Sequence, residues 1–320
     1  MKYIEFVNGL IRKEVLNAKG IVLFGQNITA GSCLSGLTKE LTVTGRSRIM
    51  NTQNSENTLT GIGFGLMISG VSSIFFMKQL DFLLLGMDHL VNTYNFVRLG
   101  RPQASFTIVC VVVDIGYQGM QSSFNNLEDI CSLARVPGYT ITNQHDARQV
   151  IGSKLICPGF RIIAVSQRLF KEAIIEFNNT VYAEKDCQLF QYTKGRDATI
   201  VCFNFSLPKG AALYDRLKHH GYNAALFGVN SAGQTKWNRI INHVRHSRRL
   251  VLIDDSKCQN SASQQLAAEA FRSCRIEKYI SLKRQFSNTW YRPNPENLTI
   301  DYEAVAKKLM TSGSQRQRMP

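Results

Sequence analysis

The stretch "SRIMNTQNSENTLTGIGFGLMISGVSSIFFM", residues 47–77, contains the pattern that decides the fold. Its two ends, 47–51 and 72–77, are short runs of strand-forming residues, and the part between them is helical in character from Glu56 onward. A strand, a helix and a second strand in this order predict a unit whose strands lie parallel. Glu56 stands alone at the start of the helix, because residues 51–70 contain no Lys, Arg, Asp or second Glu that could pair with it.

The same alternation extends along most of the chain. Further strands are expected at 20–25, 106–114, 139–143, 161–167, 198–205, 222–230, 248–255 and 276–283, with helices between them, including helices at 3–17 and 80–97. A more polar and irregular segment, 171–197, interrupts the pattern. The sequence therefore predicts two three-layer α/β domains with largely parallel sheets, residues 1–190 and 191–310, and a basic flexible tail, 311–320.

The composition is that of a globular protein, with 44% hydrophobic and 19% charged residues among 320. The chain has no uninterrupted run of the roughly 18 apolar residues that a membrane span needs. The N-terminus lacks the apolar centre of a signal peptide, so we expect a cytoplasmic protein with no membrane partner. The eight cysteines are scattered without a C-x-x-C pair, which indicates reduced thiols and no metal site.

The net charge of +15 requires a separate interpretation. The densest basic segments are 239–249 and the tail, and neither is interleaved with aromatic residues as a single-strand binding groove would be. We therefore expect a solvated or partner-facing basic surface and no nucleic-acid partner. His243 and His246 lie one turn apart, but no nearby acid or cysteine completes a metal site, and solvated surface positions are expected for them.

Three successive segments then resemble a known family. They are "GQNITAGSCLSGLTKEL" (25–41), "RIMNTQNSENTLTGIGFGLMISGV" (48–71) and "KQLDFLLLGMDHLVNTYN" (78–95). Together they resemble the thiamine diphosphate-dependent transketolase superfamily, in the form of the β subunit of 2-oxo acid dehydrogenase decarboxylating components. Similarity continues through "NLEDICSLARVPGYTITNQHDA" (126–147), "GRDATIVCF" (195–203) and "RRLVLIDD" (248–255). It covers nearly the whole chain and implies a pyrimidine-binding domain followed by a transketolase C-terminal-like domain.

The resemblance gives Glu56 a catalytic role. In the family, the matching acid hydrogen-bonds a ring nitrogen of the cofactor's aminopyrimidine and shares a proton with it, and apolar surroundings favour that role by raising the pKa of the acid. The alternative is that Glu56 only occupies a first helical turn, where the helix dipole favours an acid. The resemblance also places Phe82 on the pyrimidine, although Phe82 could instead be a core aromatic. Asn54 and Lys78 match other positions that line the pyrimidine.

The sequence departs from the family in two places. No Gly-Asp-Gly, the family's diphosphate and Mg²⁺ motif, occurs in the chain. An α-type partner should therefore hold the diphosphate and Mg²⁺, and the resemblance implies an α2β2 assembly with the active site between subunits. The family's loop histidine is also missing, and the nearest positions, Gln121 and Ser122, are candidates to contact the substrate.

The preferred hypothesis is a β-like subunit that makes or breaks a carbon–carbon bond next to a carbonyl, by transketolase-type ketol or acyl transfer on a small keto substrate. The alternatives are a 2-oxo acid decarboxylating β subunit and a degenerate, non-catalytic subunit that stabilises its partner. A third and weaker alternative, an anion- or nucleic-acid-binding module, rests on charge alone. The sequence names neither the substrates nor what the positive charge binds.

Overall fold

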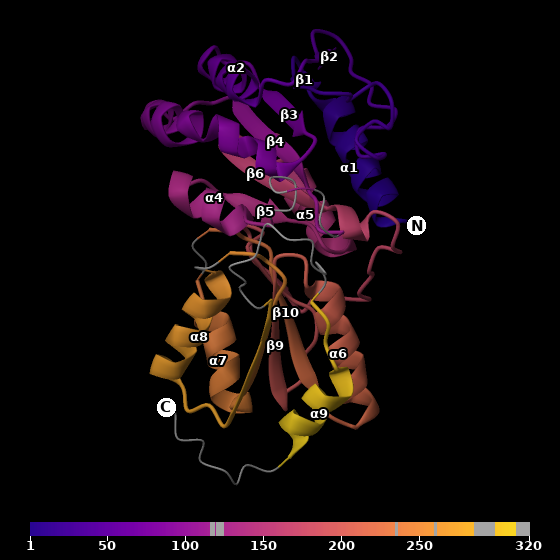
Figure 1. Ribbon diagram of the computed structural model, residues 1–320, viewed down its shortest axis with the longest axis vertical. Helices are drawn as coiled ribbons and strands as arrows, with labels where there is room; N and C mark the ends of the chain where they lie inside the picture. The colour runs from indigo at the N-terminus through magenta and orange to yellow at the C-terminus, as the bar shows by residue number, and fades with distance from the viewer. Residues whose placement is uncertain (116–118, 120–124, 234–235, 259–260, 285–297, 312–320) are drawn as a thin grey trace.

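The computed structural model describes residues 1–115, 119, 125–233, 236–258, 261–284 and 298–311. The chain forms two α/β domains, one above the other along its long axis (Figure 1). Each domain is built on a six-stranded sheet whose two faces are covered by helices. The predicted fold class, two three-layer α/β domains with largely parallel sheets, is confirmed.

The first sheet is parallel, and its strands run in the order β2-β1-β3-β4-β6-β5. Its strands are β1 (Val22–Gly25), β2 (Arg48–Asn51), β3 (Ser73–Met77), β4 (Ser105–Val112), β5 (Gly138–Thr140) and β6 (Gly159–Ser166). Every residue of the central strand β4 is buried, which agrees with its apolar, β-branched sequence. The helices on one face are α1 (Tyr3–Asn17) and α5 (Gln144–Lys154), and those on the other are α2 (Glu56–Ile68) and α4 (Leu127–Ala134).

The segment 80–97, expected as one helix, is instead broken into short helical pieces. They are the 3-10 helix η1 (Leu80–Gly86), the π-helix η2 (His89–Thr93), α3 (Tyr94–Val97) and the 3-10 turn η3 (Arg98–Gly100). The break falls at Gly86, which approaches α2 so closely that a side chain there would lie 2.6 Å from Thr60 Oγ1. The segment thus bends around the start of α2. Irregular helical geometry of this kind is frequent beside functional sites.

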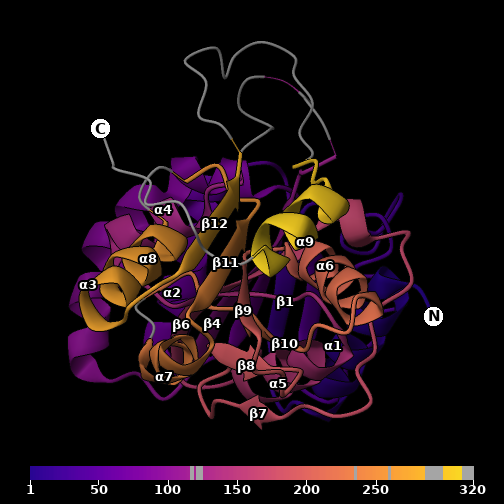
Figure 2. The same cartoon turned by 90° about the horizontal axis from the view of Figure 1, so that it is seen from below.

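The second sheet has the order β12-β11-β9-β10-β8-β7. Its strands are β7 (Tyr182–Ala183), β8 (Leu189–Gln191), β9 (Ala198–Phe203), β10 (Ala224–Val229), β11 (Arg249–Asp254) and β12 (Lys278–Lys283). Figure 2 shows α6 (Leu207–His219) and α9 (Tyr302–Met310) on one side of this sheet, and α7 (Asn238–Ser247) and α8 (Ala262–Ser273) on the other. Strands β7 and β8 arise from the segment expected to be irregular, and they join the sheet antiparallel. The second sheet therefore starts before residue 191, and the domain boundary at that position stays a prediction.

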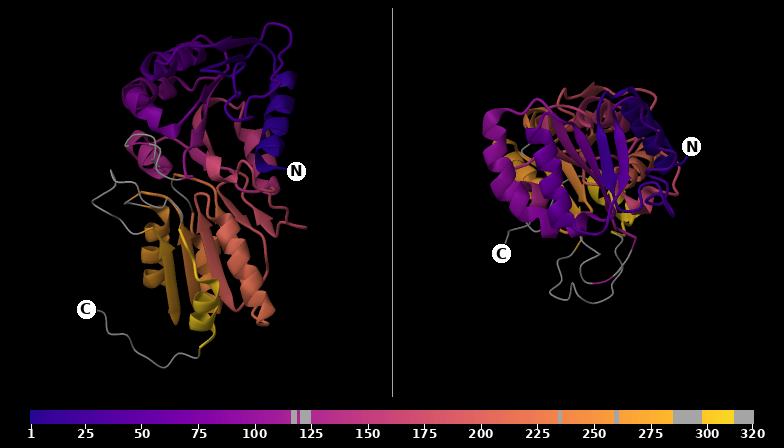
Figure 3. Two further views of the ribbon diagram at one scale, coloured as in Figure 1. Left: turned by 45° about the vertical axis from the view of Figure 1, so that its right-hand side comes forward. Right: turned by 90° about the horizontal axis from the view of Figure 1, so that it is seen from above.

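The carboxyl ends of the two sheets face each other where the domains meet (Figure 3). The backbone N–H of Thr140, at the end of β5, donates to the carbonyl of Asn230, just after β10, at 2.8 Å. One hydrophobic cluster also continues from α1 and α5 of the first domain into α6 and α9 of the second. The two domains therefore share part of their core.

Candidate functional site

The carboxyl edge of the first sheet has a point where the order of the strands reverses. The chain passes from β1 to its neighbour β2, and then crosses back to β3 on the other side of β1. In open parallel sheets, ligands bind outside the carboxyl ends of the strands at such a switch point. The segments that leave β2 and β3 at this edge carry Asn54 and Glu56, and Lys78 and Phe82, respectively.

Glu56 is the first residue of α2 and is half-buried. Within the described part of the chain, its carboxylate forms neither an ion pair nor a hydrogen bond. Its backbone carbonyl accepts a bond from Thr60 Oγ1 at 2.7 Å. The N-cap residue Ser55 bonds Thr58 Oγ1 at 2.9 Å and does not cap the helix. The Glu56 carboxylate thus has no polar partner in the described chain and lies at the positive end of the α2 dipole. It is less buried than its apolar sequence neighbours suggested.

The glycines of α2 bring the neighbouring elements close to the Glu56 turn. A side chain at Gly63 would lie 2.1 Å from the ring of Phe106, and one at Gly61 would lie 2.9 Å from the ring of His89. Gly65, in contrast, has open space around it. Close packing thus involves two of these three glycines, whereas the third is exposed on the outer side of α2.

Phe82 is half-buried in η1 and packs against the hydrophobic cluster between α2 and the sheet. Lys78 and Asn54 are both exposed, and neither bonds to the Glu56 carboxylate. The structure thus brings the four residues to one sheet edge without direct polar contacts among them. Gln121 and Ser122 lie outside the described residues, so their predicted roles stay predictions.

Asp81, directly before Phe82, is an acid that the sequence reasoning missed. It is fully buried at the same edge of the sheet. Burial raises the pKa of the nearby Cys110 thiol, and the charge of Asp81 raises it further. The only signal for Asp81 in the sequence was its place beside Phe82 in an otherwise apolar run.

A buried polar network lies where the carboxyl edges meet. Arg168 Nη2 lies 2.5 Å from Asp255 Oδ2 and 3.7 Å from Asp114 Oδ2, and both carboxylates are fully buried. Burial raises the pKa of Asp114, while the charge of Arg168 works in the opposite direction. Nearby, Glu128 on α4 accepts a bond from the backbone N–H of Ala262, at the start of α8, at 2.8 Å. Burial, assisted by the charge of Asp254, raises the pKa of Glu128 to about 8.

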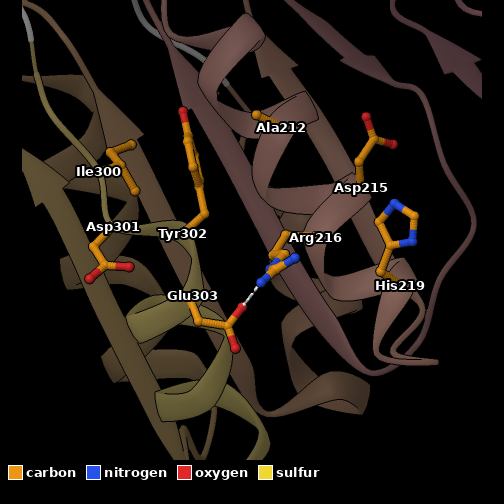
Figure 4. A pocket seen from close by; sticks show the side chains of 8 residues that line it. All are labelled: Ala212, Asp215, Arg216, His219, Ile300, Asp301, Tyr302 and Glu303. Carbon is orange, nitrogen blue, oxygen red and sulfur yellow. Dashed lines mark hydrogen bonds and ion pairs between the residues drawn. The ribbon is translucent and has the colours of Figure 1, made fainter.

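A hollow of about 600 Å³ lies between α6 and α9 (Figure 4). Arg216 and Glu303 in its lining pair with each other, and the neighbouring His220 approaches the same carboxylate at 3.4 Å. It belongs to the second domain and takes no part in the Glu56 edge. Among the described residues, no group of three or more His, Cys, Asp or Glu could hold a metal ion.

The two histidines of α7 differ from the prediction in part. His246 is exposed, but His243 is half-buried. The Nε2 of His243 donates to the carbonyl of Gly195 at 2.8 Å, so Nδ1 accepts from Thr199 Oγ1 at 2.7 Å. Burial lowers the pKa of His243, which agrees with a neutral ring.

The two-domain α/β arrangement is a transketolase-like fold. A solved structure described as a split-gene transketolase, inactive β4 tetramer, superposes with a TM-score of 0.64 at 12% identity and covers 95% of this chain and 97% of its own. No family model matches the chain. No helix among the described residues is both long and apolar enough to cross a membrane.

Sequence comparison finds β subunits of 2-oxo acid dehydrogenases among the relatives of this chain. The mitochondrial 2-oxoisovalerate dehydrogenase subunit beta of Chaetomium thermophilum is 19% identical over 279 residues, which are 84% of this chain but only 58% of that protein. The mitochondrial pyruvate dehydrogenase E1 component subunit beta-1 of Arabidopsis thaliana is 21% identical over 82% of this chain and 75% of its own length. The 2-oxoisovalerate dehydrogenase subunit beta of Bacillus subtilis is 18% identical over 89% and 88%. The resemblance predicted from the sequence is confirmed.

Proposed function

We propose that the chain is the β-like subunit of a heteromeric thiamine diphosphate-dependent enzyme. The enzyme would make or break a carbon–carbon bond next to a carbonyl, by ketol or acyl transfer of the transketolase type. The observation that carries the proposal is the Glu56 carboxylate, which has no polar partner in the described chain and stands at the switch point of a parallel sheet.

The residues at this edge suit the pyrimidine end of the cofactor. When bound, thiamine diphosphate supplies the electron sink for bond changes next to a carbonyl carbon. Glu56 would hold a proton against the aminopyrimidine ring, and a carboxylate without an ion-pair partner is free to do so. Phe82 would cover one face of the ring from η1. Asn54 and Lys78 are polar groups at the rim of the same edge.

A partner subunit would complete the site. The chain has no Gly-Asp-Gly segment for the diphosphate and Mg²⁺, so an α-type subunit would supply both, in an α2β2 assembly. The neighbouring segments α2, η1, α3 and η3 expose large apolar side chains, here called the apolar face: Ile62, Ile68, Leu84, Leu85, Phe96 and Leu99. Large apolar side chains exposed on neighbouring elements are typical of a protein interface. The split-gene transketolase neighbour, inactive as a β4 tetramer, is consistent with a β chain that needs a partner.

The finer features of the proposal depend on that assembly. Gln121 or Ser122 would bind an oxygen of a small keto substrate. A cytoplasmic location and a place in carbohydrate metabolism fit the transferase chemistry and remain part of the proposal.

The second candidate function is 2-oxo acid decarboxylation, which the names of the aligned relatives favour. The missing loop histidine weighs against transfer to a lipoyl group. The two candidates separate in a single assay of the assembled enzyme, since ketol transfer consumes a sugar-like acceptor and releases no carbon dioxide. A non-catalytic subunit would support neither reaction.

The decisive experiment is co-expression with an α-type subunit, followed by calorimetry with thiamine diphosphate and Mg²⁺. We expect tight binding by the pair and none by this chain alone. In the pair, Glu56→Gln should abolish turnover but preserve assembly, whereas Leu85→Glu in the apolar face should prevent assembly. Full turnover by the Glu56→Gln enzyme would refute the proposed role.

A further inference from the structure

The positive charge of the chain is concentrated in its C-terminal part. Residues 191–320 contain 21 Lys and Arg and 9 Asp and Glu, which accounts for +12 of the total of +15. Two of these nine acids, Asp254 and Asp255, are fully buried and do not reach the surface. The described surface of the second domain therefore carries fewer acids than the count of nine indicates.

Helix α7 presents one face of this basic surface to solvent. Its apolar side faces the sheet through buried isoleucines and valine, while Arg239, Asn242, Arg245 and His246 are exposed. The helical period places these four side chains on the same side of α7. From Lys236 to Arg249 the sequence contains no acid. We call Lys236, Arg239, Arg245 and His246 the α7 patch.

The stability of the helix does not explain the whole patch. Cations are favoured at the C-terminal end of a helix, which accounts for Arg245 and His246. Arg239 lies in the first turn, at the positive end of the dipole, where a cation is unfavourable. The first turns of α1, α2, α4, α5 and α9 all contain an acid, whereas those of α6, α7 and α8 in the second domain contain none.

Neutral neighbours hold the arginines of the patch in place and leave their charge intact. Arg239 Nε donates to Gln191 Oε1 at 3.0 Å, and its guanidinium lies 3.9 Å from the centre of the Tyr182 ring. Arg245 donates to Asn242 Oδ1 at 2.9 Å. Figure 2 shows α7 at the rim of the domain, near β7 and β8. An oriented, unneutralised guanidinium is well prepared for an anionic partner, because little side-chain freedom remains to be lost.

The surroundings of the patch indicate the kind of partner. In the described part of the second domain, only one large apolar side chain, Phe271, is exposed. A folded partner usually buries an apolar centre, which this surface does not offer. The ring of Tyr182 is covered by Arg239, and Trp237 packs edge-on to Phe203. Single-stranded nucleic acids depend on free aromatic faces for stacking, whereas carboxylates need only the forked guanidinium.

We propose that the α7 patch binds an extended, acid-rich polypeptide segment of a partner protein, through Arg239 and Arg245. This inference does not rest on the proposed catalytic function. It assigns a second interaction surface to the chain, on the opposite domain from the apolar face. Because the contacts are exposed charge pairs, we expect binding to be fast, weak and sensitive to salt.

The test is fluorescence anisotropy with the full chain and a fluorescein-labelled polyglutamate peptide of about 20 residues, at increasing NaCl. The Arg239→Gln/Arg245→Gln variant should bind about five to thirty times more weakly than the wild type, as expected for two lost exposed pairs. The matched control, Arg46→Gln/Arg101→Gln, removes two exposed arginines from the first domain and should bind like the wild type. Equal thermal unfolding of the two variants shows that both are folded.

Several outcomes would overturn the proposal. Equal weakening by both double variants would show general charge attraction without a defined surface. Absence of peptide binding at low salt would show that the α7 patch does not bind an acidic polypeptide. A labelled RNA of about 20 nucleotides serves as the competing ligand. If its binding depends on Arg239 and Arg245 as strongly as that of the peptide, the patch does not select carboxylates and the assignment to a polypeptide fails.

Discussion

Arg168 is the cation between two buried acids of different domains, and its removal should cost much of the stability of the chain. In Arg168→Met, the carboxylates of Asp114 and Asp255, both fully buried, would lose the guanidinium that lies 3.7 Å and 2.5 Å from them. Leaving buried charges without a partner costs about 3–5 kcal/mol. With an unfolding entropy of about 2.1 cal/mol/K per residue over 320 residues, a loss of 4 kcal/mol lowers the Tm by about 6 °C if both domains unfold together.

The pH dependence gives this prediction a second, independent readout. Burial already raises the pKa of Asp114, and Arg168 limits that rise. Without Arg168 the folded-state pKa should rise further above the unfolded value, so the folded variant retains a proton that the unfolded chain releases. Stability of the variant should then fall as the pH increases from 5 to 8, and the difference from the wild type should be largest at high pH.

Urea unfolding at pH 5 and pH 8, with Arg248→Met as the matched control, checks the prediction. Arg248 pairs with Glu277 at 3.1 Å on the surface, and its loss should cost less than about 1 kcal/mol. The double variant Arg168→Met/Asp255→Asn should be less destabilised than the sum of the single variants, because the two residues interact directly. A cost below about 1 kcal/mol for Arg168→Met, with additive single effects, would refute the reasoning.

Three further predictions concern buried polar groups and glycines. The Asp146 carboxylate accepts hydrogen bonds from Thr142, Asn143 and Asn230. In Asp146→Asn an amide N–H would face these donors, so the free energy of unfolding in urea should fall by about 2–4 kcal/mol. An unchanged free energy of unfolding would contradict this prediction. Burial raises the pKa of Glu128 to about 8, above its unfolded value, so the wild type should lose stability as the pH rises from 5 to 8. The stability of Glu128→Gln relative to the wild type should therefore increase over this range and stay constant above pH 8. A stability difference that does not depend on pH would count against this prediction. Gly63→Ala should destabilise strongly through its clash with Phe106, whereas Gly65→Ala, in open space, should add up to about 1 kcal/mol to the stability of the isolated chain, as thermal melts would show.

Most of the fold could be predicted from the sequence, because its strands and helices are local patterns. Strand β4 is an apolar run that is buried throughout, and α2 follows β2 after a short polar turn. The segment 80–97 could not be predicted as well. Its apolar residues have helical spacing, but the approach of Gly86 to Thr60 is a contact between elements that no local pattern encodes.

The candidate site could be predicted in position but not in environment. The resemblance and the strand order place Glu56 and Phe82 at one edge of the sheet. The sequence suggested a buried Glu56, and the described chain leaves it half-exposed. The network around Arg168 could not be predicted for another reason. Arg168 and Asp255 are separated by 87 positions, and the sequence does not distinguish a buried aspartate from an exposed one.

The facing carboxyl edges restrict how this chain can be divided or recombined. A truncation that kept only residues 191–311 would open Asp254 and Asp255 to water and strip Glu128 from the start of α8. It would also cut the apolar cluster that runs from α1 to α9. An exchange of the second domain between distant homologues should therefore succeed only when Asp114, Arg168 and Asp255 are exchanged together. The two domains are accordingly expected to be inherited together during evolution.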